Sequence, residues 1–305
     1  MSPLAALILD WLMTAFWPII GMSGLAYYSG MLFTEAGLVI GLAALAPFLF
    51  VRGRWRRLFD ASTAPALAAM GFFSGLATII FISALAYTTP ANAAIMAQIE
   101  VLYSAALCTL LLKERIGKGQ AAAGLLVLAG TGLVMGHDLT SPRWRGDLMI
   151  LATPWMYQVS HVFSKKLPRN LDPVAISGGR IFYGILSLLP FAAWAVARGG
   201  SWSWQPRALG ILALQGVTMS CLNFVLWYRA IGGMDLSKAT VVMLSYPALT
   251  VLFSWLLGRE TIGLIQVLGL LITFAGAYWT SLLVLKAQRG EPARSRVEPE
   301  AAPEV

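Results

Sequence analysis

A single carboxylate stands inside a long apolar run, at Glu100. A carboxyl group in hydrocarbon costs at least ~2.5 kcal/mol, so this side chain should face a cavity or a partner. Desolvation favours its protonated form, which suits proton coupling or the binding of a cationic group. Tyr103 lies three residues further on and shares its helical face, so it is a second candidate for the same cavity. The alternative is structural: a carboxyl that joins two helices, beside an aromatic ring that packs.

Two further segments carry polar side chains that lipid would penalise. Gln158 and His161 share a helix face at a spacing of three, and a histidine that titrates near neutrality could relay protons. The alternative for both is hydrogen bonding between helices. Arg180 is the only basic residue inside an apolar run. It could bind an anionic group, pair with a carboxylate such as Asp172, or extend to the membrane surface.

A third set of candidates comes from later segments. Asn223 and Trp227 are neighbours at a spacing of four, and Tyr246 follows in the next apolar run. All three could line a cavity, although Trp227 fits an interfacial aromatic belt equally well. Glu35, at the start of an apolar run, reads as a solvated helix end.

The composition excludes a soluble protein. Hydrophobic residues make up 58% of the 305 residues and charged residues 12%, about half the share of soluble domains. The net charge of +8 does not indicate nucleic acid, because the bases lie in short connections between apolar runs. The sequence has no zinc-protease, nucleophile-elbow or Walker motif, and its two cysteines lie apart in apolar runs. We therefore expect no enzyme, no metal and no cofactor.

The apolar runs predict an all-α integral membrane protein with ten transmembrane helices, since each run approaches the ~20 residues that cross a bilayer. Sixteen bases fall on one predicted side and five on the other, which predicts cytoplasmic termini in the inner membrane. Residues 286–305, rich in proline and charge, predict a disordered tail. The predicted helices are 4–24, 31–51, 65–87, 91–112, 119–138, 146–166, 173–197, 206–229, 236–257 and 263–285.

The chain also repeats itself. Residues 113–120, KERIGKGQ, return 146 positions later as RETIGLIQ at residues 259–266. A duplicated unit with five helices must insert upside down relative to its twin, which is the plan of many secondary transporters. We expect a first repeat over residues 1–138 and a second over 139–285, with Glu114 on the inner side and Glu260 on the outer side.

Several short motifs make the chain resemble the EamA-type transporters of the drug/metabolite transporter superfamily. They are ALAY at 84–87, QIE at 98–100, LLKER at 111–115, YRA at 228–230, SYP at 245–247 and LGRE at 257–260. The resemblance implies a cavity lined by helices 1, 3, 4, 6, 8 and 9 and alternating access to a small metabolite, with export the commoner direction. It implies structural roles for Glu114, Glu260 and the helix-bending Pro247. Val101 stands where the first half should carry the matching proline.

Two other function classes remain open. A membrane-embedded enzyme would need Glu100 and His161 as its catalytic pair. A structural or sensory subunit would have no cavity that solutes reach. Glycine pairs such as Gly71 and Gly75 let helices approach closely, within one protomer or in a homodimer.

The inverted repeat can be tested by labelling. Single cysteines placed at positions 114 and 260 should react with a membrane-impermeant thiol reagent from opposite sides of the membrane, because the two halves insert in opposite directions. The measurement is labelling of intact cells against inside-out vesicles. Labelling of both positions from one compartment would exclude the inverted arrangement.

Overall fold

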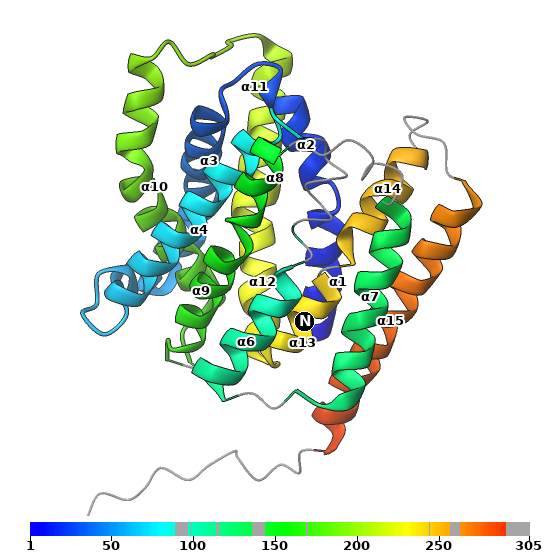
Figure 1. Ribbon diagram of the computed structural model, residues 1–305. Coiled ribbons are helices and arrows are strands. Elements are labelled where there is room, and N and C mark those ends of the chain that lie inside the picture. The colour runs from blue at the N-terminus through cyan, green and yellow to red at the C-terminus, as the bar shows by residue number, and fades with distance from the viewer. Residues whose placement is uncertain are drawn as a thin grey trace, which may run out of the picture.

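The computed structural model describes residues 1–88, 97, 99–113, 116–135, 144–168, 170–243, 245–256 and 263–290, and all regular structure in these ranges is helical (Figure 1). In the first half the helices are α1 (Pro3–Thr14), α2 (Trp17–Leu25), α3 (Gly30–Phe50), η1 (Val51–Leu58), α4 (Ala64–Ala84), α6 (Glu100–Leu112) and α7 (Lys118–Met135). In the second half they are α8 (Trp144–Leu151), α9 (Pro154–Lys165), α10 (Pro173–Ala197), α11 (Pro206–Leu214), η3 (Gln215–Leu222), α12 (Asn223–Gly232), α13 (Leu236–Met243), α14 (Tyr246–Leu256) and α15 (Leu264–Gly290).

These helices follow the predicted apolar runs closely, and the prediction of an all-α membrane fold is confirmed. Within the described ranges, five helical segments are long and apolar enough to cross a bilayer. They are Pro3–Leu25, Gly30–Phe50, Ala64–Ala84, Pro173–Ala197 and Pro206–Gly232. The full number of crossings stays a prediction.

Among the described residues, three of the predicted helices are interrupted, and each interruption has a proline just after it. Pro18 follows the junction of α1 and α2, Pro154 begins α9, and Pro247 is the second residue of α14. Proline has no N–H to donate and its ring crowds the preceding turn, so it is tolerated at the start of a helix and weakens the interior, although α3 and α10 continue through Pro47 and Pro190. The chain therefore changes direction at three points that, as shown below, border the central cavity.

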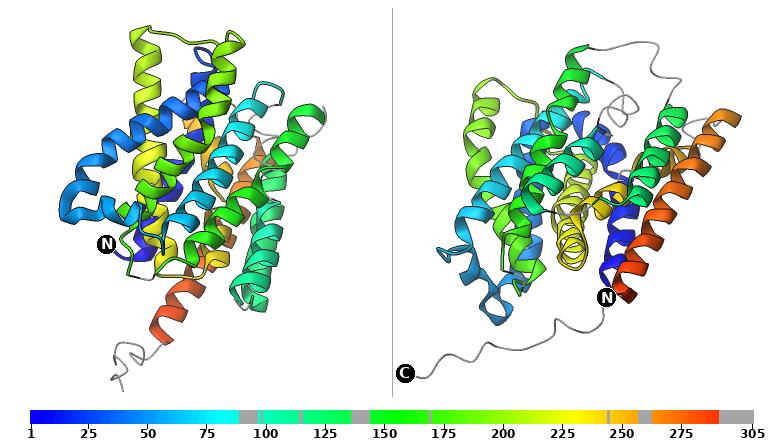
Figure 2. Two further views of the ribbon diagram at one scale, coloured as in Figure 1. Left: turned by 90° about the vertical axis from the view of Figure 1, so that its left-hand side faces the viewer. Right: turned by 60° about the horizontal axis from the view of Figure 1, so that its bottom comes forward.

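The helices pack as a set of crossed pairs. α3 packs against α10 and against η3. α4 packs against α10 and α9, and α1 packs against α12. α7 and α15 pack mainly against each other and run side by side along one edge of the molecule (Figures 1 and 2). This edge pair leaves the other helices to build the interior.

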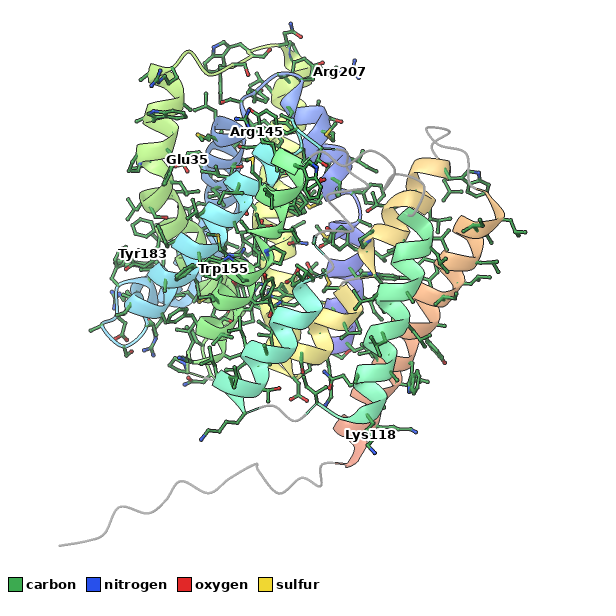
Figure 3. The ribbon with its side chains drawn as sticks, in the orientation of Figure 1. Glu35, Lys118, Arg145, Trp155, Tyr183 and Arg207 are labelled. Carbon is green, nitrogen blue, oxygen red and sulfur yellow. The ribbon has the colours of Figure 1, made fainter. Side chains whose placement is uncertain are left out.

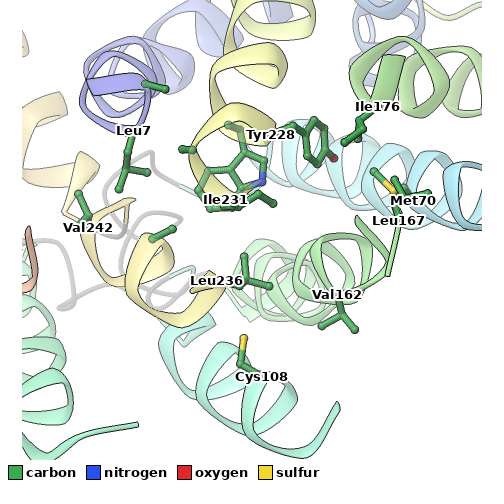
Figure 4. Close-up of a cluster of buried hydrophobic side chains, with 14 of the residues drawn as sticks. Leu7, Met70, Cys108, Val162, Leu167, Ile176, Tyr228, Ile231, Leu236 and Val242 are labelled. Carbon is green, nitrogen blue, oxygen red and sulfur yellow. The ribbon is translucent and has the colours of Figure 1, made fainter. Parts of the chain in front are cut away.

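An apolar cluster closes one end of that interior. It draws Leu7 from α1, Cys108 from α6 and Ile231 from α12, with further residues from α4, α9, α10 and α13 (Figure 4). Near it, Lys165 donates hydrogen bonds to the carbonyls of Ile231 and Met234. A second cluster, with Ile82 and Leu212, lies among α2, α3, α4, α8 and α11. The polar groups described next lie between these two clusters.

A close contact between the backbones of two helices predicts a glycine that matters for packing. A methyl group on Gly71 would lie 2.5 Å from the backbone nitrogen of Gly184, so α4 and α10 would have to separate. Gly71→Ala should lower the free energy of unfolding by about 1–3 kcal/mol, the usual cost of overpacking. The measurement is thermal unfolding of the purified protein in detergent.

Gly132→Ala on α7 is the matched control, because no atom lies within 4 Å of its added methyl group. Both changes gain the same helix propensity, so their difference reports packing. Equal melting temperatures would contradict the close contact at Gly71.

Candidate functional site

A cavity of about 170 Å³ lies in the middle of the molecule, between the two apolar clusters. Every helix that the family resemblance implied contributes to its wall, and α3 and α10 add a few residues more. The volume exceeds by far what one water needs and lies below that of a pocket for a drug-sized ligand. Its polar and charged lining residues are Asp10, Thr14, Thr34, Thr78, Glu100, Thr153, Tyr157, His161, Arg180, Gln215, Ser220, Asn223, Thr240 and Tyr246.

Glu100 lines this cavity at the start of α6, and Gln158 on α9 holds it in place. Gln158 Nε2 donates to Glu100 Oε1 at 2.7 Å and approaches Thr240 Oγ1 on α13 at 3.3 Å. The Gln158 side chain is fully buried, so an unpaired amide there would be costly. The two separate candidates thus meet, and their bonds link three helices, although Gln158 itself is not among the residues that line the cavity.

Tyr103 lies elsewhere. It is half-buried on α6 and is absent from the cavity wall, where Tyr157 supplies a hydroxyl instead. The Tyr157 hydroxyl lies 3.0 Å from Thr78 Oγ1 on α4. A residue three positions after Glu100 is almost a full turn further along the helix, and α6 carries Tyr103 away from the cavity. Sharing a helical face was therefore insufficient to predict a shared cavity.

His161 and Trp227, which the sequence offered as separate candidates, are in contact in the structure. Trp227 Nε1 donates to His161 Nδ1 at 3.0 Å, with the ring centroids 4.8 Å apart. A histidine that accepts at Nδ1 is the neutral tautomer with its proton on Nε2. Trp227 is buried between α12 and α9, so it is a cavity residue and does not belong to an aromatic belt.

Arg180 reaches the cavity from α10 but is tied to protein groups. Its Nε donates to Ser74 Oγ at 2.8 Å and its Nη1 donates to the Tyr228 hydroxyl at 3.0 Å. The guanidinium also lies 3.8 Å above the ring of Phe224, a close cation–π contact. These partners come from α4 and α12, so Arg180 joins three helices and still faces the cavity.

Asp172, suggested as a partner for Arg180, is used differently. It caps α10 by accepting from the Val174 N–H at 2.8 Å, and it pairs with Arg54 Nε at 2.9 Å. Arg180 is two turns further along α10, beyond the reach of this carboxylate.

Asn223 and Tyr246 both line the cavity, as the sequence predicted for them. Asn223 Nδ2 donates to Thr14 Oγ1 at 2.8 Å, which joins α12 to α1. Tyr246 is the first residue of α14 and Pro247 the second, so the ring that lines the cavity lies at the break between α13 and α14. Glu114 and Glu260 lie outside the described residues.

Several buried polar residues of the cavity wall were not among the sequence candidates, and three of them have an oxygen left unpaired within the described part of the chain. Asp10, Thr34 and Gln215 line the cavity, and each has a buried oxygen that finds no hydrogen-bond partner among the described residues. Asp10 is only 1% exposed and sits in an apolar run, the same signal that pointed to Glu100. Gln215 begins the π-helical segment η3, a distortion that is frequent at functional sites. Nothing in the local sequence predicts that distortion.

Glu35, expected at a solvated helix end, is buried on α3 and absent from the cavity wall. Both of its carboxylate oxygens lack a partner among the described residues. Within the same ranges no group of three or more histidine, cysteine or acidic side chains could hold a metal ion.

This arrangement defines a multi-pass helical membrane protein with a polar cavity among its helices. A sequence model of the EamA-like transporter family matches residues 1–136 and 144–282, so the chain belongs to that family. The family is one of transporters, which confirms the resemblance drawn from the motifs.

Named relatives agree with this assignment. The chain is 24% identical to the uncharacterized transporter YoaV of Bacillus subtilis, over 51% of this chain and 52% of the relative, so the match spans about half of YoaV. It is 24% identical to an uncharacterized transporter of Archaeoglobus fulgidus, over 65% and 69% of the two chains. The biotin transporter of Escherichia coli K12 is also 24% identical, over 62% of each chain.

A solved crystal structure has the same fold. It superimposes with a TM-score of 0.77 at 19% identity and covers 92% of this chain and 98% of its own. Likeness at this identity concerns the fold alone.

The cavity predicts which positions water-borne reagents reach. Asn223→Cys should react with a small cationic thiol reagent, because the side chain faces the cavity. Leu271→Cys on α15, which is exposed on the outer surface of the helices, should lie in lipid and stay unlabelled. The measurement is the labelled fraction in membranes, in a background that lacks Cys108 and Cys221. An unreactive position 223, beside labelling of a loop cysteine, would exclude a cavity that solutes reach.

Proposed function

We propose that this protein is a secondary active transporter that moves a small metabolite through the central cavity by alternating access. The observation that carries the proposal is the cavity itself. Charged and polar side chains from eight predicted membrane helices converge on one central cavity, and lipid would penalise the same side chains on the outer surface. No nucleic acid, cofactor or ATP-binding sequence enters the mechanism.

The inverted repeat fits the packing of the helices. At the 146-residue offset α3 corresponds to α10, α4 to the run from α11 to α12, and the α1–α2 pair to the α8–α9 pair. The contact between α3 and η3 is then the counterpart of the contact between α10 and α4. In the same way, the contact between α1 and α12 is the counterpart of the contact between α9 and α4. Such a pairing supports two halves, residues 1–138 and 139–285, that rock about a central site.

The two halves carry unlike groups at equivalent positions of the wall. Glu100 is equivalent to Tyr246, and Arg180 is equivalent to Thr34. A symmetric scaffold with an asymmetric lining suits a solute whose two ends differ. We assign binding and coupling to the lining residues, with Glu100, held by Gln158, as the group that exchanges a proton or receives a cationic group.

The membrane orientation is part of the proposal. Lys118 lies at one end of the molecule, and Arg145 and Arg207 lie at the other (Figure 3). This separation supports the two membrane sides predicted from the sequence, with the termini on the cytoplasmic side. The ten crossings of the inner membrane are proposed from the number of apolar runs. Export is the direction that we propose for a small metabolite.

The decisive experiment combines profiling with reconstitution. Metabolites that change between cells with and without the gene are offered to the purified protein in vesicles. A transporter moves one of them across the intact bilayer unchanged. Chemical conversion of the solute would instead support a membrane enzyme, and neither movement nor conversion would support a structural or sensory subunit.

The role of Glu100 is tested by substitution. Glu100→Gln keeps the size and a hydrogen-bonding group but cannot ionise, so transport of the identified solute should fall at least tenfold while the protein still reaches the membrane. The measurement is the initial rate of transport in vesicles at matched protein levels. Glu35→Gln is the control, because it neutralises a buried carboxyl that lies off the cavity wall. Unchanged transport by Glu100→Gln would remove Glu100 from the mechanism.

A further inference from the structure

The connection between α3 and α4 has the composition of a lipid-binding surface. α3 ends at Phe50 and α4 begins at Ala64, so η1 lies where the chain leaves one predicted span and enters the next. Residues 51–60 read VRGRWRRLFD, with four arginines and a single acid. This segment projects from the molecule at the level of the N-terminus (Figure 2).

Its aromatic side chains are uncovered by the described protein. Phe50 is 67% exposed, Phe59 55% and Trp55 39%. The ring of Trp55 lies 6.3 Å from that of Phe50 and 6.5 Å from that of Phe59, so the three form one continuous apolar surface. Exposed rings of this size at the end of a membrane helix fit the headgroup region, where tryptophan is enriched.

The arginines of η1 differ in how much of their charge is neutralised. Arg54 is occupied, since it pairs with Asp172 and donates to the carbonyl of Phe48. Arg57 makes one exposed contact of 3.2 Å with Asp60, an arrangement that contributes little to stability. Arg56 stacks at 5.7 Å from the Trp55 ring and has no acidic partner among the described residues.

We propose that Arg56, Arg57 and Trp55 form a binding site for the headgroup of one anionic phospholipid. The phosphate takes hydrogen bonds from the two guanidinium groups, whose planar forks match a phosphate well. The acyl chains lie along Phe50 and Phe59. A zwitterionic phospholipid offers no net charge to the uncompensated arginines and binds this site poorly.

A lipid at this position would hold two parts of the fold together. η1 is already tied to α10 by Arg54 and Asp172 and by the Tyr183 hydroxyl, which donates to the Leu58 carbonyl at 2.9 Å. The ring of Phe59 also lies 5.3 Å from that of Phe182 on α10. Because the lipid contacts the folded arrangement of these elements, its binding raises the stability of the folded state.

The experiment counts retained lipid. The full chain is placed in nanodiscs of palmitoyl-oleoyl phosphatidylcholine with one quarter of the corresponding phosphatidylglycerol, then extracted gently for native mass spectrometry. The wild type should retain phosphatidylglycerol selectively. The double variant Arg56→Gln and Arg57→Gln should bind it roughly 30-fold more weakly, since each arginine near an anionic lipid surface contributes about one kilocalorie per mole. Trp55→Ala should also lower retention.

The matched control neutralises two arginines at the other end of the molecule, Arg198 and Arg207. Arg198 stacks on the exposed Trp194 at the same 5.7 Å distance that separates Arg56 from Trp55. The control should retain as much phosphatidylglycerol as the wild type. An equal loss in both double variants would overturn the site in favour of general charge attraction, and no loss in either would also overturn it.

Thermal unfolding in detergent gives a second readout. Added phosphatidylglycerol should raise the melting temperature of the wild type by several degrees and that of the Arg56/Arg57 variant by less. Inorganic phosphate at the same concentration should have no such effect, and an equal shift would overturn the assignment to a lipid. Transport activity enters neither measurement, so the site stands or fails separately from the transport function.

Discussion

The cost of placing polar groups in a low-dielectric interior organises this protein. The two charged side chains at the cavity that are hydrogen-bonded, Glu100 and Arg180, take their partners from other helices, whereas Asp10 keeps an oxygen without a partner among the described residues. Glu100 on α6 is bonded by Gln158 on α9, and Arg180 on α10 is bonded by Ser74 on α4 and by the hydroxyl of Tyr228 on α12. The polar network therefore sets the arrangement of the helices as well as the chemistry of the cavity. Any motion of the helices must either preserve these bonds or exchange them for bonds to a solute.

The apolar contacts exclude water from the rest of the interior, because the helices pack closely on both sides of the cavity. Buried apolar side chains from seven helices close the interior at one end, and a second cluster lies towards the other. Close helix contacts such as Gly71 against Gly184 leave no room for water between α4 and α10. The cavity is thus confined to the level where the proline-interrupted helices change direction. A break in a membrane helix is costly where the freed backbone groups face lipid. At the cavity, the breaks beside Pro18, Pro154 and Pro247 face a polar space.

Much of the fold, and some of the polar residues that line the cavity, could be predicted from the sequence. The ends of a long apolar run predict the ends of the helix that it forms. Accordingly, α3, α4 and α10 begin and end within a few residues of the predicted helices. Glu100 was found because a carboxylate in an apolar run is costly. The same rule applies to Asp10, which the sequence analysis considered only as evidence against a cleaved signal peptide. The hydrogen-bond partners of these groups were harder to predict, because partners can lie far apart along the chain. Asp172, for example, accepts a hydrogen bond from Arg54, which is 118 residues away.

By itself the sequence determined the class of the protein, the extent of its helices, the family and the charged groups that a membrane interior must accommodate. These follow from composition and short motifs, which depend on residues close together along the chain. Only the tertiary structure decided which of these groups meet. It brought Gln158 to Glu100 and Trp227 to His161, placed Tyr103 away from the cavity, and added Asp10 and Gln215 to its wall. The physical reason is that helix rotation and crossing are set by packing across the whole bundle, which no local stretch of residues encodes.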